Sequence, residues 1–143
     1  MRIDPVTEAT PELEQALARL LTQLNPTLPV PTMQRLKAII ADPAVTLLVA
    51  RDGDDVIGTA TVIVYTTPFW IKARLDEVVV DQFERGKGIG EALVLACLAV
   101  ARDRGVQIVE LQSGRGPARE VANRLYRRMG FELRDSNLYR ITI

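Results

Sequence analysis

The sequence contains no histidine, one cysteine and two serines. Without histidine the chain cannot form a Ser-His-Asp triad or a histidine-ligated metal site, and we expect no metal. The single cysteine, Cys97, cannot close an internal disulfide. It lies in the apolar stretch 92–100 and has no histidine to activate it, so we expect it in the core. Any chemistry must therefore use carboxylates, tyrosine, backbone groups or a bound cofactor.

The sequence also lacks net charge and long apolar runs. Eighteen basic residues balance eighteen acidic residues, which gives no support to a general nucleic-acid or anionic-membrane surface. No apolar run approaches the roughly 18 residues of a membrane span. With 143 residues, 48% of them hydrophobic, we expect one globular domain over residues 1–143. We expect this domain to be cytoplasmic and to bind neither nucleic acid nor membrane.

Hydrophobic periodicity and turn residues predict alternating strands and helices. Thr10 before Pro11 and Thr32 before Met33 are typical of helix starts. The predicted helices span 11–25, 33–40, 88–104 and 117–129. The predicted strands span 46–50, 56–65, 74–80, 107–112, 131–133 and 138–143. Hairpin strands followed by strand, helix, strand and helix indicate an α/β (α+β) fold with a mixed sheet and helices on its faces.

A basic, glycine-rich turn joins the strand that ends at Val80 to the following helix. The turn reads Arg85-Gly86-Lys87-Gly88-Ile89-Gly90. Unpaired backbone N–H groups and the positive end of the helix dipole attract an anion at such a helix start. Glycines, which have no Cβ, let the backbone approach phosphate oxygens closely. The turn matches neither of the two common nucleotide motifs, and a helix start whose glycines serve only packing is the alternative.

Together with a second motif, this turn resembles the GNAT superfamily of acyl-CoA-dependent N-acetyltransferases. The second motif is the run Asn123-Arg124-Leu125-Tyr126-Arg127-Arg128-Met129-Gly130-Phe131. The resemblance covers roughly residues 46 to 133, with one departure at Gln82, where the family often has proline. It implies a GNAT-like fold, in which a single mixed, mostly antiparallel sheet of about six to seven strands is flanked by about four helices. The sheet is expected to splay at its two central parallel strands.

The resemblance also implies a site for acetyl-CoA. The turn from Arg85 to Gly90 would hold the coenzyme A pyrophosphate, and Asn123 would contact the cofactor. Tyr126 would act as the acid for the departing thiolate, although simple amphipathic packing is an alternative role for this side chain. The backbone of the strand before the turn would line the pantetheine arm through Val78, Val79 and Val80.

Two carboxylates precede the turn and are candidates for the general base. An alkyl ammonium has a pKa near 10.4, so neutralising it at pH 7 costs about 4 to 5 kcal/mol and some base or water path is useful. Asp76 and Glu77 are neighbours on a predicted strand, and neighbouring strand residues face opposite ways. We therefore expect only one of them in the acceptor cleft and favour Glu77. A solvated or structurally paired carboxylate is the alternative for each.

The predicted function is transfer of an acetyl group from acetyl-CoA to a primary amine of a small molecule, by direct attack in a ternary complex. A protein lysine or N-terminal acetyltransferase and a non-catalytic acyl-CoA-binding or sensing module are the alternatives. The acceptor pocket could be lined by residues 25–31, by the loop 66–70 or by the terminal hairpin. The aromatic loop 66–70 could equally be packing or the contact of a homodimer.

One strand also resembles that of glucosamine-6-phosphate N-acetyltransferases, namely residues 71–81, which read IKARLDEVVVD. That resemblance would bring Arg115 and Arg119 to an anionic acceptor. A solvated helix start is the alternative role for both arginines.

Overall fold

A computed structural model describes all 143 residues of the chain. The chain divides into two compact units, Met1–Gln112 and Ser113–Ile143, which we describe separately. The first unit holds five strands: β1 (Arg2–Pro5), β2 (Val45–Asp52), β3 (Asp55–Thr66), β4 (Ile71–Val80) and β5 (Ile108–Leu111). Its helices are α1 (Pro11–Leu24), α2 (Met33–Ala41) and α3 (Ile89–Asp103), with a short 3₁₀ helix η1 (Gln82–Glu84) before α3. The second unit holds the 3₁₀ helix η2 (Pro117–Arg119) and α4 (Glu120–Arg128).

The five strands form one sheet in the order β1-β2-β3-β4-β5. The pairs β1–β2, β2–β3 and β3–β4 are antiparallel, and β4–β5 is parallel. The parallel pairing runs only from Lys72 opposite Ile108 to Leu75 opposite Leu111. Residues 76–80 of β4 therefore extend beyond the last residue that β5 pairs, so the mixed, mostly antiparallel sheet parts at its parallel strands.

The predicted number of six to seven strands is wrong, because residues 131–143 form neither a helix nor a strand. A strand needs a neighbouring strand to pair with, and the unit Ser113–Ile143 contains no strand. The apolar side chains that suggested a terminal hairpin are exposed, among them Leu138 and Ile141. The parallel strands are consequently not both central, because β5 is the edge of the sheet.

Strand β1 was not predicted. Its sequence, Arg-Ile-Asp-Pro, carries the two residue types that strands disfavour most, and only its pairing with β2 makes it a strand. Proline is tolerated there because β1 is an edge strand.

The first two helices begin where the sequence predicted. The Thr10 hydroxyl accepts a hydrogen bond from the Leu13 N–H at 3.1 Å, and Thr32 accepts one from the Arg35 N–H at 3.1 Å. Pro11 occupies the first turn of α1, where its missing N–H is not needed. None of the helices is both long and apolar enough to cross a membrane.

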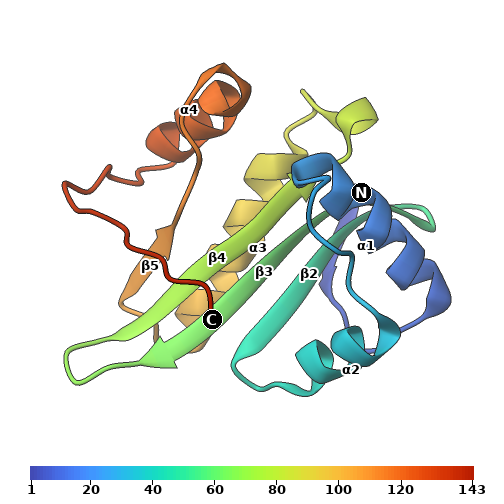
Figure 1. Cartoon of the computed structure of the whole chain (residues 1–143), viewed down its shortest axis with the longest axis horizontal. Coiled ribbons are helices and arrows are strands. Elements are labelled where there is room, and N and C mark those ends of the chain that lie inside the picture. Colours follow the sequence, from blue (N-terminus) through green and yellow to red (C-terminus); the bar gives the residue numbers. More distant parts are fainter. The chain divides into compact units, whose positions relative to one another are not determined.

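Helices cover both faces of the sheet in the unit Met1–Gln112, with α1 and α2 in front of it and α3 behind it in Figure 1. The core under α1 and α2 is aliphatic: Leu13, Leu17, Leu20, Leu36, Leu47, Val49, Val56 and Val79. On α3, Cys97 is fully buried, and burial raises the pKa of its thiol to about 12. The thiol is thus neutral at physiological pH, as expected for a core cysteine.

Candidate functional site

The glycine turn forms an open concavity at the amino terminus of α3. Gly86 and Gly88 have φ values of 80° and 79°, in the left-handed region that favours glycine. Gly88 is the N-cap of α3, and no side chain caps the helix. The N–H groups of Gly88, Ile89 and Gly90 have no acceptor in the protein. No atom lies within 4 Å of where a Cβ would stand on Gly86 or Gly88, so an anion could reach these N–H groups.

The two basic side chains of the turn are partly engaged. Arg85 Nε donates to the Val80 carbonyl at 3.3 Å, which ties the turn to the end of β4. Lys87 Nζ forms an ion pair with Glu84 at 2.6 Å, and this hydrogen bond raises the pKa of Lys87. Both residues can add positive charge at the rim of the turn. The backbone N–H groups are more accessible to an anion than these two side chains, which already have partners.

Helix α1 holds the base of the turn. Asp81, which is 7% exposed, directly follows β4 and caps η1 by accepting from the Phe83 N–H at 3.1 Å. The Arg19 guanidinium of α1 forms an ion pair with Asp81. Its Nη2 also donates to the Val56 carbonyl of β3 at 2.8 Å. One arginine thus joins α1, β3 and the entry of the turn.

A second bond from α1 explains the departure at Gln82. The backbone N–H of Gln82 donates to Gln23 Oε1 at 2.9 Å. Proline, the residue that often stands here in the family resembled, has no N–H and could not make this bond. In this chain glutamine therefore gives the turn an attachment that proline would remove.

A β-bulge in β4 sets the positions of the two candidate carboxylates. Thr59 pairs with Val79 and Thr61 with Asp76, so Ala60 of β3 faces two residues of β4, Glu77 and Val78. Glu77 is the only non-glycine residue with a positive φ, 45°. A left-handed conformation costs roughly 1 to 3 kcal/mol at such a residue, so the surrounding structure must hold it there. Such held outliers cluster at functional sites.

The bulge breaks the alternation on which the expectation of a single carboxylate in the cleft was based, but of the two carboxylates only Glu77 lines a pocket. Asp76 pairs with Thr61 and shares its face of the sheet, and both Thr61 and Glu77 line one pocket on that face. Asp76 is held in an ion pair, because Arg74 Nε lies 3.1 Å from Oδ1 and 3.2 Å from Oδ2. Arg74 also donates to Gln112 at 3.2 Å. Asp76 is therefore a paired carboxylate.

Glu77 is different, since no hydrogen bond or ion pair holds its carboxylate. Glu77 is still partly exposed to solvent; its partial desolvation raises the pKa of its carboxyl, and the negative charge of Asp76 raises it further. The positive charge of Arg74 acts in the opposite direction. A carboxylate with a raised pKa is a better proton acceptor than a free one.

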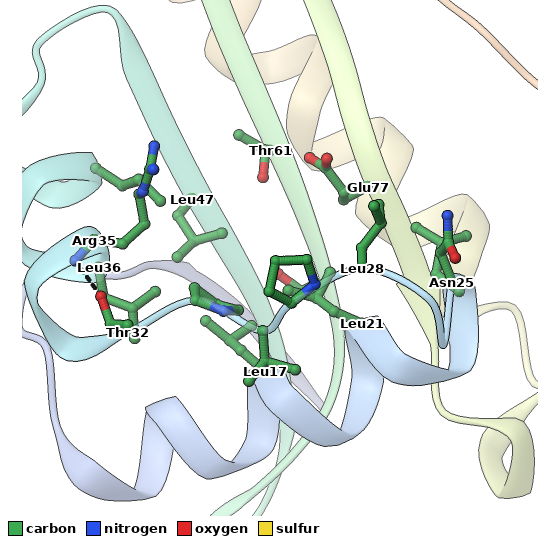
Figure 2. A pocket seen from close by; sticks show the side chains of 16 residues that line it. Leu17, Leu21, Asn25, Leu28, Thr32, Arg35, Leu36, Leu47, Thr61 and Glu77 are labelled. Carbon is green, nitrogen blue, oxygen red and sulfur yellow. Dashed lines mark hydrogen bonds between the residues drawn. The ribbon is translucent and has the colours of Figure 1, made fainter. Parts of the chain in front are cut away.

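The pocket beside Glu77 has a volume of about 480 Å³ and lies between the sheet and the segment that joins α1 to α2 (Figure 2). Five residues of the segment 25–31 line it, whereas no residue of the loop 66–70 does. That loop is exposed, with Phe69 at 86%. The lining residues are Leu17, Leu21, Leu24, Asn25, Leu28, Pro29, Val30, Pro31, Thr32, Arg35, Leu36, Ile39, Leu47, Thr59, Thr61 and Glu77.

The strand before the turn has one unpaired edge. Val79 and Val80 pair with Thr59 and Gly58 of β3, and Val78 lies at the bulge. On the other side β5 pairs only residues 72–75 of β4. The backbone of residues 76–80 therefore has polar groups available to an extended ligand.

The second motif lies in the unit Ser113–Ile143, which we describe by itself. Asn123 Nδ2 donates to the Gly114 carbonyl at 3.0 Å, so this amide holds the loop before α4. The ring of Tyr126 meets that of Phe131 edge to face, with centroids 5.9 Å apart and planes at 71°. The Phe131 N–H donates to the Tyr126 carbonyl at 3.0 Å. The motif is thus a local structure that closes the end of α4.

Sequence reasoning missed Arg19, Gln23, Arg35 and the leucines that α1, α2 and β2 contribute to the pocket. The stripe of leucines on α1 was visible, but periodicity cannot tell a side chain that lines a pocket from one in the core. The bonds of Arg19 and Gln23 join residues 62 and 59 positions apart, so no local pattern marks them.

Three comparisons relate the chain to known proteins. The family model described as "Acetyltransferase (GNAT) family" matches residues 11–131. An uncharacterized N-acetyltransferase of Methanocaldococcus jannaschii is 42% identical over 60 residues, which are 42% of this chain and 26% of that protein. The match with this curated relative thus spans about a quarter of its length.

Solved structures with this fold cover almost the whole chain. A proposed acetyltransferase of Agrobacterium tumefaciens superposes with a TM-score of 0.86 at 22% identity, covering 99% of this chain and 100% of that one. An aminoglycoside acetyltransferase from a soil metagenome, in complex with sisomicin, has a TM-score of 0.83 at 18% identity, covering 99% and 96%. Glucosamine-6-phosphate N-acetyltransferase from Arabidopsis thaliana has a TM-score of 0.79 at 16% identity, covering 99% of each. At these identities the likeness shows the fold.

The bond between Gln23 and Gln82 can be measured by a double-mutant cycle. We expect Gln82→Pro to lower the free energy of unfolding by about 1 kcal/mol more in the wild type than in a Gln23→Ala background. Only the wild type has this hydrogen bond to lose. Urea unfolding measures both differences. Gln82→Ala, which keeps the N–H, is the matched control and should show no such coupling. Equal effects of proline in both backgrounds would refute the attachment.

Proposed function

We propose that this chain, which belongs to the acetyltransferase (GNAT) family, transfers an acetyl group from acetyl-CoA to a primary amine of a small molecule. The match with the family model confirms the family and the enzyme class that the two motifs predicted. One observation supports the finer proposal. Glu77, whose pKa is raised, lines an apolar pocket, and it belongs to the strand that leads into the uncapped glycine turn. A proton acceptor and an anion site are thus built on one strand and the loop that follows it.

The residues at the turn fit acetyl-CoA. The N–H groups of Gly88, Ile89 and Gly90 would bind its pyrophosphate, with Arg85 and Lys87 adding charge at the rim. The unpaired edge of residues 78–80 would bind the pantetheine amides, and the Asn123 amide would contact the same ligand. Bound acetyl-CoA would supply a thioester carbonyl as the acyl donor, which the amine attacks directly in a ternary complex.

Glu77 would accept the proton that the ammonium must lose. No cation forms an ion pair with its carboxylate, in contrast to Asp76, which Arg74 holds. Asp76 would act indirectly, since its charge contributes to the raised pKa of Glu77. Tyr126 would protonate the departing thiolate, as its counterpart often does in the family.

The pocket favours a small acceptor over a protein chain. Residues 25–31, α1 and α2 wall it in, and a volume of about 480 Å³ is the usual size for a small-molecule site. Two relatives with this fold are named for acceptors of that class, an aminoglycoside and glucosamine 6-phosphate.

An acceptor screen by thiol release tests the proposal. We expect turnover with some small amines, and we expect Gly88→Glu to abolish acetyl-CoA binding through charge and bulk in the turn. Gly105→Glu is the matched control, because Gly105 ends the same helix with a φ of 72° and open space around it. Calorimetry should find wild-type affinity in the control. Acetyl-CoA binding without turnover of any amine would instead favour a sensing module, and turnover of peptides alone would favour a protein acetyltransferase.

Glu77→Gln tests the general base. We expect kcat at saturating amine to fall about a hundredfold and to lose its acid limb, whose midpoint in the wild type should lie above 4.5, the ordinary pKa of a glutamate. A carboxyl whose pKa is raised on folding destabilises the protein as pH rises through that pKa, so Glu77→Gln should not lower stability at pH 7. Asp76→Asn should move the limb to lower pH and keep turnover. Loss of the limb in Asp76→Asn alone would assign the base to Asp76.

Tyr126→Phe tests the acid. We expect kcat to fall about tenfold or more while the Kd for acetyl-CoA stays unchanged. The effect should be moderate because a thiol with a pKa near 8.5 is already a fair leaving group. Phenylalanine keeps the aromatic ring that meets Phe131. Tyr139→Phe, at a residue 87% exposed, is the matched control. Unchanged turnover would remove Tyr126 from the mechanism.

A further inference from the structure

The walls of the pocket beside Glu77 are aliphatic on almost every side. Helix α1, helix α2 and strand β2 contribute Leu17, Leu21, Leu24, Leu36, Ile39 and Leu47. The joining segment adds Leu28 and Val30, which are 63% and 44% exposed at the rim. A ligand with an apolar body would cover these side chains, whereas a polyhydroxylated one would place hydroxyl groups against leucine without hydrogen-bond partners.

The pocket is lined by few polar side chains, and most of these carry no charge. The Thr59 hydroxyl donates to the Leu48 carbonyl at 2.9 Å. Only two lining side chains carry charge, Glu77 on β4 and Arg35 on α2, and neither forms an ion pair. Figure 2 shows them on opposite sides of the pocket, with Thr61 between them.

The elements that carry these two charges lie on either side of the pocket. Helix α2 packs on β2, and β2 and β4 lie on either side of β3. Two strand spacings of about 4.8 Å separate β2 from β4, so the floor of the pocket between these strands is roughly 10 Å wide.

From this arrangement we propose that the acceptor is an amine on an apolar body that carries an anionic group at its far end. The ammonium end would lie at Glu77 and the anionic end at Arg35, and the apolar body would cross the two strand spacings, roughly 10 Å, between β4 and β2. This inference rests on the proposed function, and it names the class of acceptor. Aminosugars and aminoglycosides fall outside the class, because their bodies are hydrophilic.

Three probe amines test the class. The first, 8-aminooctanoate, has an apolar chain of the required length with charges at both ends, octylamine lacks the anion, and glucosamine 6-phosphate has the anion on a hydrophilic body. We expect kcat/KM to be highest for 8-aminooctanoate, about tenfold above octylamine and a hundredfold or more above glucosamine 6-phosphate. An equal or higher value for glucosamine 6-phosphate would overturn the proposal.

Arg35→Met tests the anionic end. It should lower kcat/KM for 8-aminooctanoate about tenfold more than for octylamine, because only the first acceptor loses an ion pair. Lys37→Met is the matched control, since Lys37 is an exposed cation of the same helix outside the pocket and should leave the preference unchanged. Equal effects of Arg35→Met on both acceptors would refute the role of Arg35.

Failure of the proposed function can be distinguished from failure of this inference. If no amine is acetylated, calorimetry of 8-aminooctanoate binding to the wild type, Arg35→Met and Lys37→Met still decides whether the pocket binds this class. Binding that depends on Arg35 would support the inference without catalysis. Absence of binding in a protein that acetylates other amines would overturn the inference and leave the function standing.

Discussion

The ion pair between Arg19 and Asp81 is the interaction on which the arrangement of the site depends. Asp81 stands where β4 ends and the turn begins, and its low exposure makes an unpaired carboxylate costly there. Arg19 neutralises it and also binds the Val56 carbonyl of β3. The opposite face of α1 supplies leucines to the pocket. A single helix therefore fixes the pocket wall and the base of the glycine turn with respect to one sheet.

The bulge at Glu77 is the second constraint. A regular strand would have turned Asp76 and Glu77 to opposite faces, and the charge of Asp76 would then have raised the pKa of Glu77 less directly. The extra residue brings a paired and an unpaired carboxylate to the same side. The positive φ of Glu77 shows that the chain accepts local strain to hold this geometry.

The helix starts at Thr10, Thr32 and Gly88 could be predicted, because capping is chemistry within a few residues of chain. The same is true of the glycine turn. Strand β1 and the bulge could not, since both arise from pairing with distant segments that local sequence does not reveal. The terminal hairpin was expected from two apolar segments around the turn 135–137. It is absent, because such a local pattern does not guarantee that the two segments pair. Nothing in the sequence distinguishes Arg35 from other exposed arginines on helices, and only the structure shows that it lines the pocket.

The segment that joins α1 to α2 contains Pro26, Pro29 and Pro31. Each ring fixes one backbone torsion, so this wall of the pocket has little conformational freedom to lose when a ligand arrives. If the pocket binds the acceptor as proposed, the acceptor would meet a largely preorganised surface, and less of its binding energy would go into ordering the protein. A rigid wall would also keep the width of the pocket constant, so the enzyme would select acceptors by their length rather than by their flexibility.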